Sequence, residues 1–159
     1  MSFWPIILIV LAIAMAVGPV MMMQPTTRDR RLAGLRQDAA QAGLHVRMSD
    51  YEKGEKKRPV AVYTYQVNLP KGTPTWSLIR RSYSHDIHFH ATWEWRSTNK
   101  KISSEKEDQL FQFIDNLPED IVGLEVNEMM VGIWWQEKSP TITIKKIKQL
   151  LQQLVVIAS

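Results

Sequence analysis

The sequence predicts an α+β fold in which one N-terminal transmembrane helix precedes a mostly antiparallel sheet with about three packed helices. Three observations lead to this prediction. An uncharged run from Phe3 to Met23 has the length of a membrane-spanning helix. After it, several segments with the apolar alternation of strands follow one another, with segments of helical apolar spacing between these groups. Such an order favours a mostly antiparallel sheet with packed helices. The 159 residues are 45% hydrophobic and 23% charged, as in ordinary globular proteins.

The N-terminal apolar segment reads FWPIILIVLAIAMAVGPVMMM. A helix of this length spans about 30 Å of hydrocarbon, and Trp4 stands at the end where an indole prefers the membrane interface. We therefore expect residues 1–25 to form a transmembrane anchor. A cleaved signal peptide is the alternative, since Ala14-Met15-Ala16 resembles a cleavage site, although no Lys or Arg precedes the apolar run.

The charge of the chain is unevenly placed. No charged residue precedes Arg28, residues 28–58 hold nine basic and five acidic side chains, and residues 59–159 hold eleven of each. Basic residues that directly follow an apolar segment are typical of the cytoplasmic side of an anchor. We expect Arg28, Arg30 and Arg31 to lie at the membrane interface, with the N-terminus outside and the domain in the cytoplasm. The lipid bilayer, not nucleic acid, is the expected partner of this basic region.

Residues 26–58 form the basic juxtamembrane part, which is continuous with the rest of the domain. We expect a helix that Thr27 caps and Gly43 ends, followed by a short strand over residues 44–48. The charged segment Ser49–Arg58 is expected to be an exposed loop, which either contacts lipid headgroups or is simply solvated.

Residues 59–159 are expected to form the α+β cytoplasmic domain. Ser104-Glu105-Lys106-Glu107 has the form of a capping box and opens a helix that Pro118 ends. Ser139 and Pro140 are expected to cap and begin a last helix, whose apolar stripe docks on the sheet. The expected strands, of which the last two form a hairpin, cover residues 60–67, 76–81, 86–96, 121–126 and 130–135.

Three of the four histidines lie close together in the run from His85 to His90. Asp86 to Arg96 alternates strictly, so Asp86, His88 and His90 share the predicted solvent face of one strand. Two imidazoles and a carboxylate are ligands suited to Zn²⁺ or Fe²⁺. A metal-binding sensor or metal-dependent enzyme that uses His85, His88 and His90 is therefore the alternative to plain exposed polar positions.

Motifs of catalysis are missing from the sequence. It has no nucleophile elbow, phosphate-binding loop, dinucleotide fingerprint or HExxH motif, and no cysteine. We expect no cofactor and no small-molecule substrate. Residues 105–137 hold nine carboxylates and only Lys106, which suits either a solvated face or a docking surface for a basic partner. Trp134 and Trp135 point to opposite faces of a strand, so one of them is a candidate partner contact.

The apolar helix followed by Met23-Gln24-Pro25-Thr26-Thr27-Arg28-Asp29-Arg30-Arg31 resembles small single-pass bacterial inner-membrane proteins such as the YajC family of Sec accessory subunits. The resemblance covers about the first 35 residues. It implies a place in the bacterial inner membrane and assigns no role to any residue. Together these observations predict a non-enzymatic, single-pass protein, an accessory or assembly subunit of a larger membrane complex.

Overall fold

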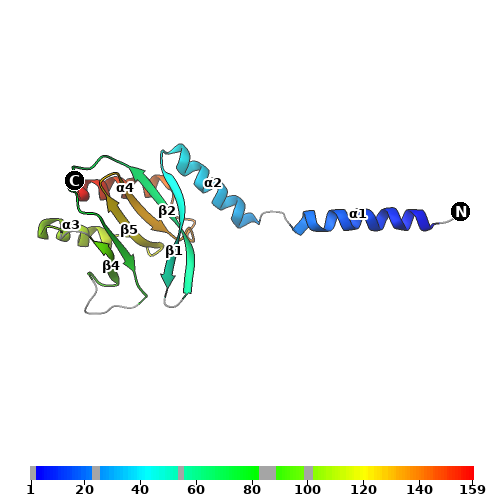
Figure 1. Ribbon diagram of the computed structural model, residues 1–159, viewed down its shortest axis with the longest axis horizontal. Helices are drawn as coiled ribbons and strands as arrows, with labels where there is room; N and C mark the ends of the chain where they lie inside the picture. Colours follow the sequence, from blue (N-terminus) through cyan, green and yellow to red (C-terminus); the bar gives the residue numbers. More distant parts are fainter. Residues whose placement is uncertain (1–2, 23–25, 54–55, 83–88, 99–101) are drawn as a thin grey trace. The chain divides into compact units, whose positions relative to one another are not determined.

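The computed structural model describes the backbone of residues 3–22, 26–53, 56–82, 89–98 and 102–159 (Figure 1). The chain divides into two compact units, Met1–Gly34 and Leu35–Ser159, and each is described by itself. The fold is α+β, with a six-stranded antiparallel sheet and four helices in the described part of the chain.

The first unit contains α1 (Trp4–Met22) and the first half of α2 (Thr27–Gln41). The large apolar side chains of α1 that the structure describes, from Trp4 to Val17, are exposed. Within the described residues, no helix combines the length and the hydropathy required of a membrane span.

The cap of α2 differs from the prediction. Thr26, not Thr27, precedes the helix, and its hydroxyl accepts a hydrogen bond from the backbone N–H of Asp29. The Asp29 carboxylate in turn accepts from the hydroxyl and the backbone N–H of Thr26, which lowers the pKa of Asp29. This reciprocal pair is a capping box with Asp in place of Glu.

The second unit is built on the sheet. Its strands are β1 (His45–Lys53), β2 (Lys56–Gln66), β3 (Trp76–Arg80), β4 (Trp93–Thr98), β5 (Ile121–Asn127) and β6 (Met130–Trp135). Their order across the sheet is β1-β2-β6-β5-β3-β4, and each strand is antiparallel to its neighbours. The predicted hairpin of the last two strands is confirmed as β5 and β6.

One face of the sheet carries the main core. Helices α3 (Ser104–Asp115) and α4 (Ile144–Ala158) supply buried leucines and isoleucines to it. The α4 stripe of Ile147, Leu151 and Leu154 has no exposed surface, which confirms that this helix docks on the sheet. Leu35 and Ala39 of α2 join the same core.

The opposite, open face of the sheet holds a second, smaller apolar cluster of Tyr51, Val60, Val62, Ile79, Val122 and Trp134. The Tyr51 hydroxyl donates a 2.5 Å hydrogen bond to the Arg80 carbonyl, which joins β1 to β3 across three intervening strands. The sheet is therefore strongly curled on this face. Burial raises the pKa of Tyr51.

Two predicted boundaries in the strands are wrong. Ser49–Arg58 is not a loop, because β1 runs to Lys53 and β2 begins at Lys56, so most of the segment belongs to a long hairpin. Nor is 86–96 one strand. Within its described part, residues 90–93 turn back on themselves through a hydrogen bond from the Trp93 N–H to the His90 carbonyl, and β4 begins only at Trp93.

Two predicted helix starts are also corrected. Ser103 occupies the N-cap of α3 and its side chain makes no capping hydrogen bond, so Ser104 is the first helical residue instead of the cap. The last helix begins at Ile144 with Thr143 as its N-cap, not at Ser139 and Pro140. The backbone N–H of Ser139 instead donates to Asp120, which ties the connection after β6 to the start of β5.

Candidate functional site

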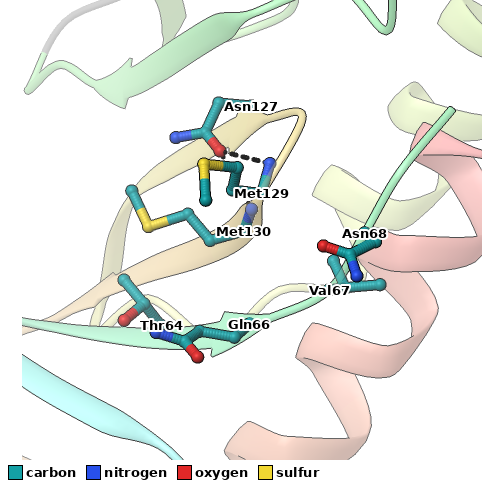
Figure 2. A pocket seen from close by; sticks show the side chains of 7 residues that line it. All are labelled: Thr64, Gln66, Val67, Asn68, Asn127, Met129 and Met130. Carbon is teal, nitrogen blue, oxygen red and sulfur yellow. Dashed lines mark hydrogen bonds between the residues drawn. The ribbon is translucent and has the colours of Figure 1, made fainter. Parts of the chain in front are cut away.

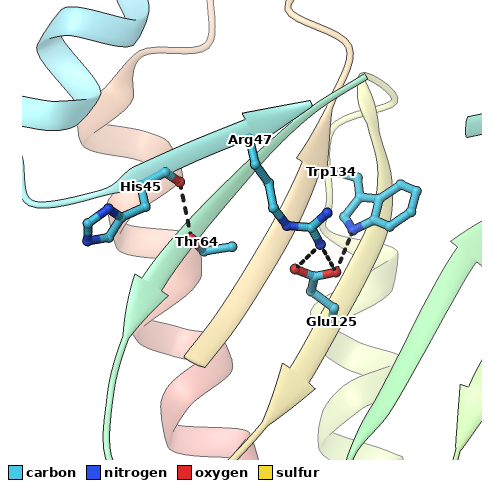
Figure 3. Close-up of polar contacts among 5 residues, drawn as sticks. All are labelled: His45, Arg47, Thr64, Glu125 and Trp134. Atoms are coloured by element: carbon cyan, nitrogen blue, oxygen red, sulfur yellow. Dashed lines mark hydrogen bonds and ion pairs between the residues drawn. The ribbon is translucent and has the colours of Figure 1, made fainter. Parts of the chain in front are cut away.

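A cluster of charged and aromatic side chains lies on the open face of the sheet (Figure 3). Arg47 of β1 contacts both carboxylate oxygens of Glu125 on β5, at 2.8 and 2.7 Å. The Trp134 indole N–H on β6 donates to the same carboxylate at 3.0 Å. One carboxylate thus connects an edge strand to the two central strands.

Two glycines make room for this cluster. A Cβ at Gly132 would lie 2.6 Å from Cγ of Glu125, and a Cβ at Gly123 would lie 2.9 Å from Cγ of Trp134. The Glu125 and Trp134 side chains therefore lie flat on the backbone of the neighbouring strand. On its other side, Trp134 is covered by the Arg96 guanidinium, 4.7 Å from the ring centroid, which is a cation–π contact.

The open face is basic. The register places Arg58 on the same face as Val60, Val62 and Arg47. The acidic groups of the face are engaged, since Glu125 binds Arg47 and Glu94 binds Arg81 at 2.6 Å. Among the described residues, no carboxylate pairs with Arg58 or Arg96. This face therefore presents an excess of positive charge.

A second polar network is buried beside α2. The Arg36 guanidinium donates to both oxygens of Glu137, at 3.1 and 2.7 Å, and the Tyr63 hydroxyl donates to the same carboxylate at 2.6 Å. Glu137 is only 5% exposed. Burial, and then the hydrogen bond to Glu137, raise the pKa of Tyr63 far above its usual value, while Glu137 raises the pKa of Arg36.

A cavity of about 550 Å³ lies where β2 ends beside the turn between β5 and β6 (Figure 2). It is lined by Thr64, Gln66, Val67, Asn68, Asn127, Met129 and Met130. Asn127 Oδ1 accepts from the backbone N–H groups of Met129 and Met130 and so holds the turn. The lining offers amides, a hydroxyl and thioethers. None of these seven side chains is ionisable at neutral pH, so they supply no general acid or base.

The histidine cluster can be followed only in part. His85, Asp86 and His88 lie outside the described residues. His90 Nε2 lies 2.8 Å from Asp115 Oδ1 of α3, and the imidazole stacks on Phe111 at 4.5 Å. Within the described part of the chain, no group of three or more histidine, aspartate or glutamate side chains could hold a metal ion.

The two candidate partner contacts on β6 are both inside the protein. Trp135 has no exposed surface and packs with Tyr63 in the main core, while Trp134 is 3% exposed in the open-face cluster. They do point to opposite faces, as the sequence indicated. Trp4, Arg28, Arg30 and Arg31 are exposed in the first unit.

The sequence analysis singled out Trp134 but missed the ion pairs at the centre of both polar networks. Arg36 and Glu137 are 101 positions apart and Arg47 and Glu125 are 78 apart, so no local motif connects them. Glycines two residues from Glu125 and Trp134 on the paired strands were a usable signal, because glycine within a strand often marks the close approach of another group.

The fold and these surfaces define a broad class: an α+β domain with one helix-covered and one open, basic sheet face. Comparison of the chain with protein-family models, with curated proteins and with solved structures found no match.

Proposed function

We propose that the chain is a non-enzymatic, single-pass protein of the bacterial inner membrane, with its N-terminus outside and its α+β domain in the cytoplasm. In this proposal the domain is an interaction module, and the protein is an accessory or assembly subunit of a larger membrane complex.

One observation carries the proposal. The six consecutive side chains Ile6 to Leu11 of α1 are each between 51% and 60% exposed. Since successive residues of a helix are turned by about 100°, six of them cover its whole circumference. A helix that is apolar on every side needs an apolar environment on every side, and a lipid bilayer supplies one. The basic residues that follow favour the stated orientation.

The second unit supports the role of an interaction module. Its open sheet face carries the exposed side chains of Arg47 and Arg96, which contact Glu125 and Trp134 respectively and are thereby held in position. Such a preorganised surface suits recognition of a partner.

Membrane insertion is tested by alkaline carbonate extraction of the tagged full chain. We expect the wild-type protein to stay in the membrane pellet with Met1 intact by mass. Lysine at both Leu8 and Leu11 costs several kcal/mol of insertion free energy and should release the chain, whereas Ile9→Leu should not. Extraction of the wild-type chain by carbonate, or loss of its N-terminal segment, would contradict the anchor.

Orientation and partnership have separate tests. Because the chain has no cysteine, Ser2→Cys and Ser159→Cys each provide one labelling site. A membrane-impermeant maleimide should label intact spheroplasts at position 2 only; the reverse pattern would contradict the orientation. The tagged chain, gently solubilised, should co-purify with a membrane protein at near-equal amounts. A monodisperse chain without a partner would contradict the accessory role.

A further inference from the structure

Two guanidiniums on the open face are held in position but keep unused hydrogen-bond donors. Both hydrogen bonds from Arg47 to Glu125 come from Nη2, so Nε and Nη1 of Arg47 have no partner among the described residues. The Arg96 guanidinium lies over the Trp134 ring, and no described carboxylate pairs with it. The Arg47 side chain is 47% exposed, and Arg96 is exposed too. Both cations can therefore donate to a ligand.

The charges around these two guanidiniums do not balance. Each contacts one member of the hydrogen-bonded pair of Glu125 and Trp134, so two positive charges accompany one negative charge. The Glu94 carboxylate of the same face is already paired with Arg81. The cluster is thus complementary to an anionic ligand, and the planar fork of a guanidinium matches a carboxylate in particular.

The cavity in Figure 2 begins one residue step from this cluster, on the same face. Glu125 and Asn127 are consecutive residues of this face on β5, about 6–7 Å apart. The register places Met130 of β6 beside Asn127, and Gln66 of β2 beside Met130. The charged cluster and the cavity therefore form one continuous surface across β2, β6 and β5.

The lining of the cavity suits an extended polypeptide. The exposed amides of Gln66 and Asn68 each offer a donor and an acceptor, as the peptide groups of a ligand do. The Met129 side chain is 73% exposed beside them, and a flexible thioether adapts to an apolar side chain. The Glu128 carboxylate in the adjoining turn accepts a hydrogen bond from the Gly72 backbone N–H.

A nucleic acid is the less suitable anionic ligand for this surface. Bases stack on exposed aromatic rings, whereas Trp134 is 3% exposed beneath the Arg96 guanidinium. One unbalanced positive charge at the cluster is also far fewer than the phosphate contacts that give nucleic-acid-binding proteins their affinity. The surface therefore favours a carboxylate ligand with peptide groups.

We propose that the open face binds an extended, acidic segment of a partner polypeptide. Its carboxylates contact Arg47 and Arg96, while its backbone and one apolar side chain occupy the cavity beside Asn127. The inference rests on the proposed function, because it names the chemistry of the partner that the interaction module binds. The whole site belongs to the second unit.

The test measures the fluorescence anisotropy of a labelled peptide with the full chain in nanodiscs of zwitterionic phosphatidylcholine. The peptide has about ten residues, enough to cross six strands at ~4.8 Å each. Pairs of glutamates alternate with pairs of valines, so each face of the extended peptide carries both types. We expect it to bind about tenfold more tightly than the same peptide with glutamine for glutamate, and to bind more weakly as salt rises.

Matched variants locate the site. Arg96→Gln removes a cation of the cluster and should weaken binding of the acidic peptide about fivefold. Gln66→Ala removes an amide of the cavity and should weaken it about threefold. Lys145→Gln on α4, which covers the other face of the sheet, makes the same change of charge as Arg96→Gln and should leave the affinity within about twofold. Circular dichroism checks that the variants fold.

Three outcomes would overturn the inference. They are equal affinity for the glutamate and glutamine peptides, equal loss of affinity in Arg96→Gln and Lys145→Gln, and tighter binding of a single-stranded oligonucleotide of the same charge that displaces the peptide. Co-purification separates this inference from the proposed function. A membrane partner at near-equal amounts without peptide binding contradicts only the acidic-ligand site, whereas a peptide-binding chain recovered without a partner contradicts only the accessory role.

Discussion

The hydroxyl of Tyr63 donates a 2.6 Å hydrogen bond to the carboxylate of Glu137, and both side chains are buried. The Arg36 guanidinium of α2 donates to the same carboxylate. The network therefore joins α2, β2 and the segment after β6 at the charge of Glu137. Glu137 has a φ of 55°, a left-handed conformation that is costly for a residue with a side chain. The surrounding contacts hold this strained residue in place, which indicates that the network fixes the second half of α2 on the sheet.

Removal of Arg36 tests that role. Arg36→Ala leaves the Glu137 carboxylate buried without its cation. We expect the free energy of unfolding to fall by about 2–3 kcal/mol. This is less than the cost of breaking a fully buried ion pair, because the Arg36 side chain is about one-third exposed. Urea unfolding of the detergent-solubilised chain measures it. Arg30→Ala, an exposed change on the same helix, is the control and should cost under about 0.5 kcal/mol. Equal effects would contradict the role of the network.

The Tyr63 hydroxyl gives a pH-dependent prediction. Its folded pKa is raised, so the unfolded state releases the phenolic proton first, near pH ~10. The stability that the hydroxyl contributes is complete below this pH and declines as pH rises above it. Tyr63→Phe should cost about 1–2 kcal/mol at pH 7, and the difference from wild type should shrink above pH ~10.

The control for this prediction is Tyr65→Phe, at a half-buried tyrosine whose hydroxyl has no hydrogen-bond partner among the described residues. It should change the free energy of unfolding little at pH 7, because no hydrogen bond is lost. The pH dependence due to Tyr51, whose pKa is also raised, remains in both variants. A constant difference between wild type and Tyr63→Phe from pH 7 to pH 11 would contradict the raised pKa of Tyr63 in the folded state.

The glycines under the open-face cluster predict a second set of losses. Gly132→Ala forces Glu125 away from Arg47 and Trp134, and Gly123→Ala displaces the Trp134 ring. We expect each to lower the free energy of unfolding by about 1–3 kcal/mol, and Gly123→Ala to shift the tryptophan fluorescence. Gly34→Ala in α2 meets no atom within 4 Å and should instead stabilise its helix. Unchanged stability in both sheet variants would contradict the packed cluster.

The sequence predicted the elements that depend on local periodicity. The apolar stripes of α3 and α4 and the β5–β6 hairpin are confirmed. They could be predicted because the residues that face the core recur at the regular spacing of a helix or a strand. The β1–β2 hairpin was missed because Ser49–Arg58 has the charged composition of a loop. In the structure, β1 and β2 pair within this segment as far as Lys53 opposite Lys56. The ion pairs of Arg36 and Arg47 are formed by tertiary packing, which leaves no local pattern.

The long strand predicted over residues 86–96 fails for a backbone reason. Ala91 has a φ of 49°, a left-handed conformation that strict alternation of polar and apolar residues cannot reveal. The hydrogen bonds of Phe89 and Trp93 close a tight turn around it. The apolar alternation holds on both sides of the turn, since Phe89 before it and Trp93 and Trp95 after it all pack in the main core.

Substitutions at Ala91 distinguish the turn from a strand by the order of stabilities. In a left-handed turn, glycine has no Cβ to strain, whereas a β-branched side chain is strained most. We therefore expect Ala91→Gly to change the free energy of unfolding by between 0 and about +1 kcal/mol. We expect Ala91→Val to lower it by about 1–2 kcal/mol. In a continuous strand the order would be reversed, because valine favours a strand and glycine weakens it. Thermal unfolding of the two variants beside wild type measures the order, and greater stability of the valine variant would contradict the turn.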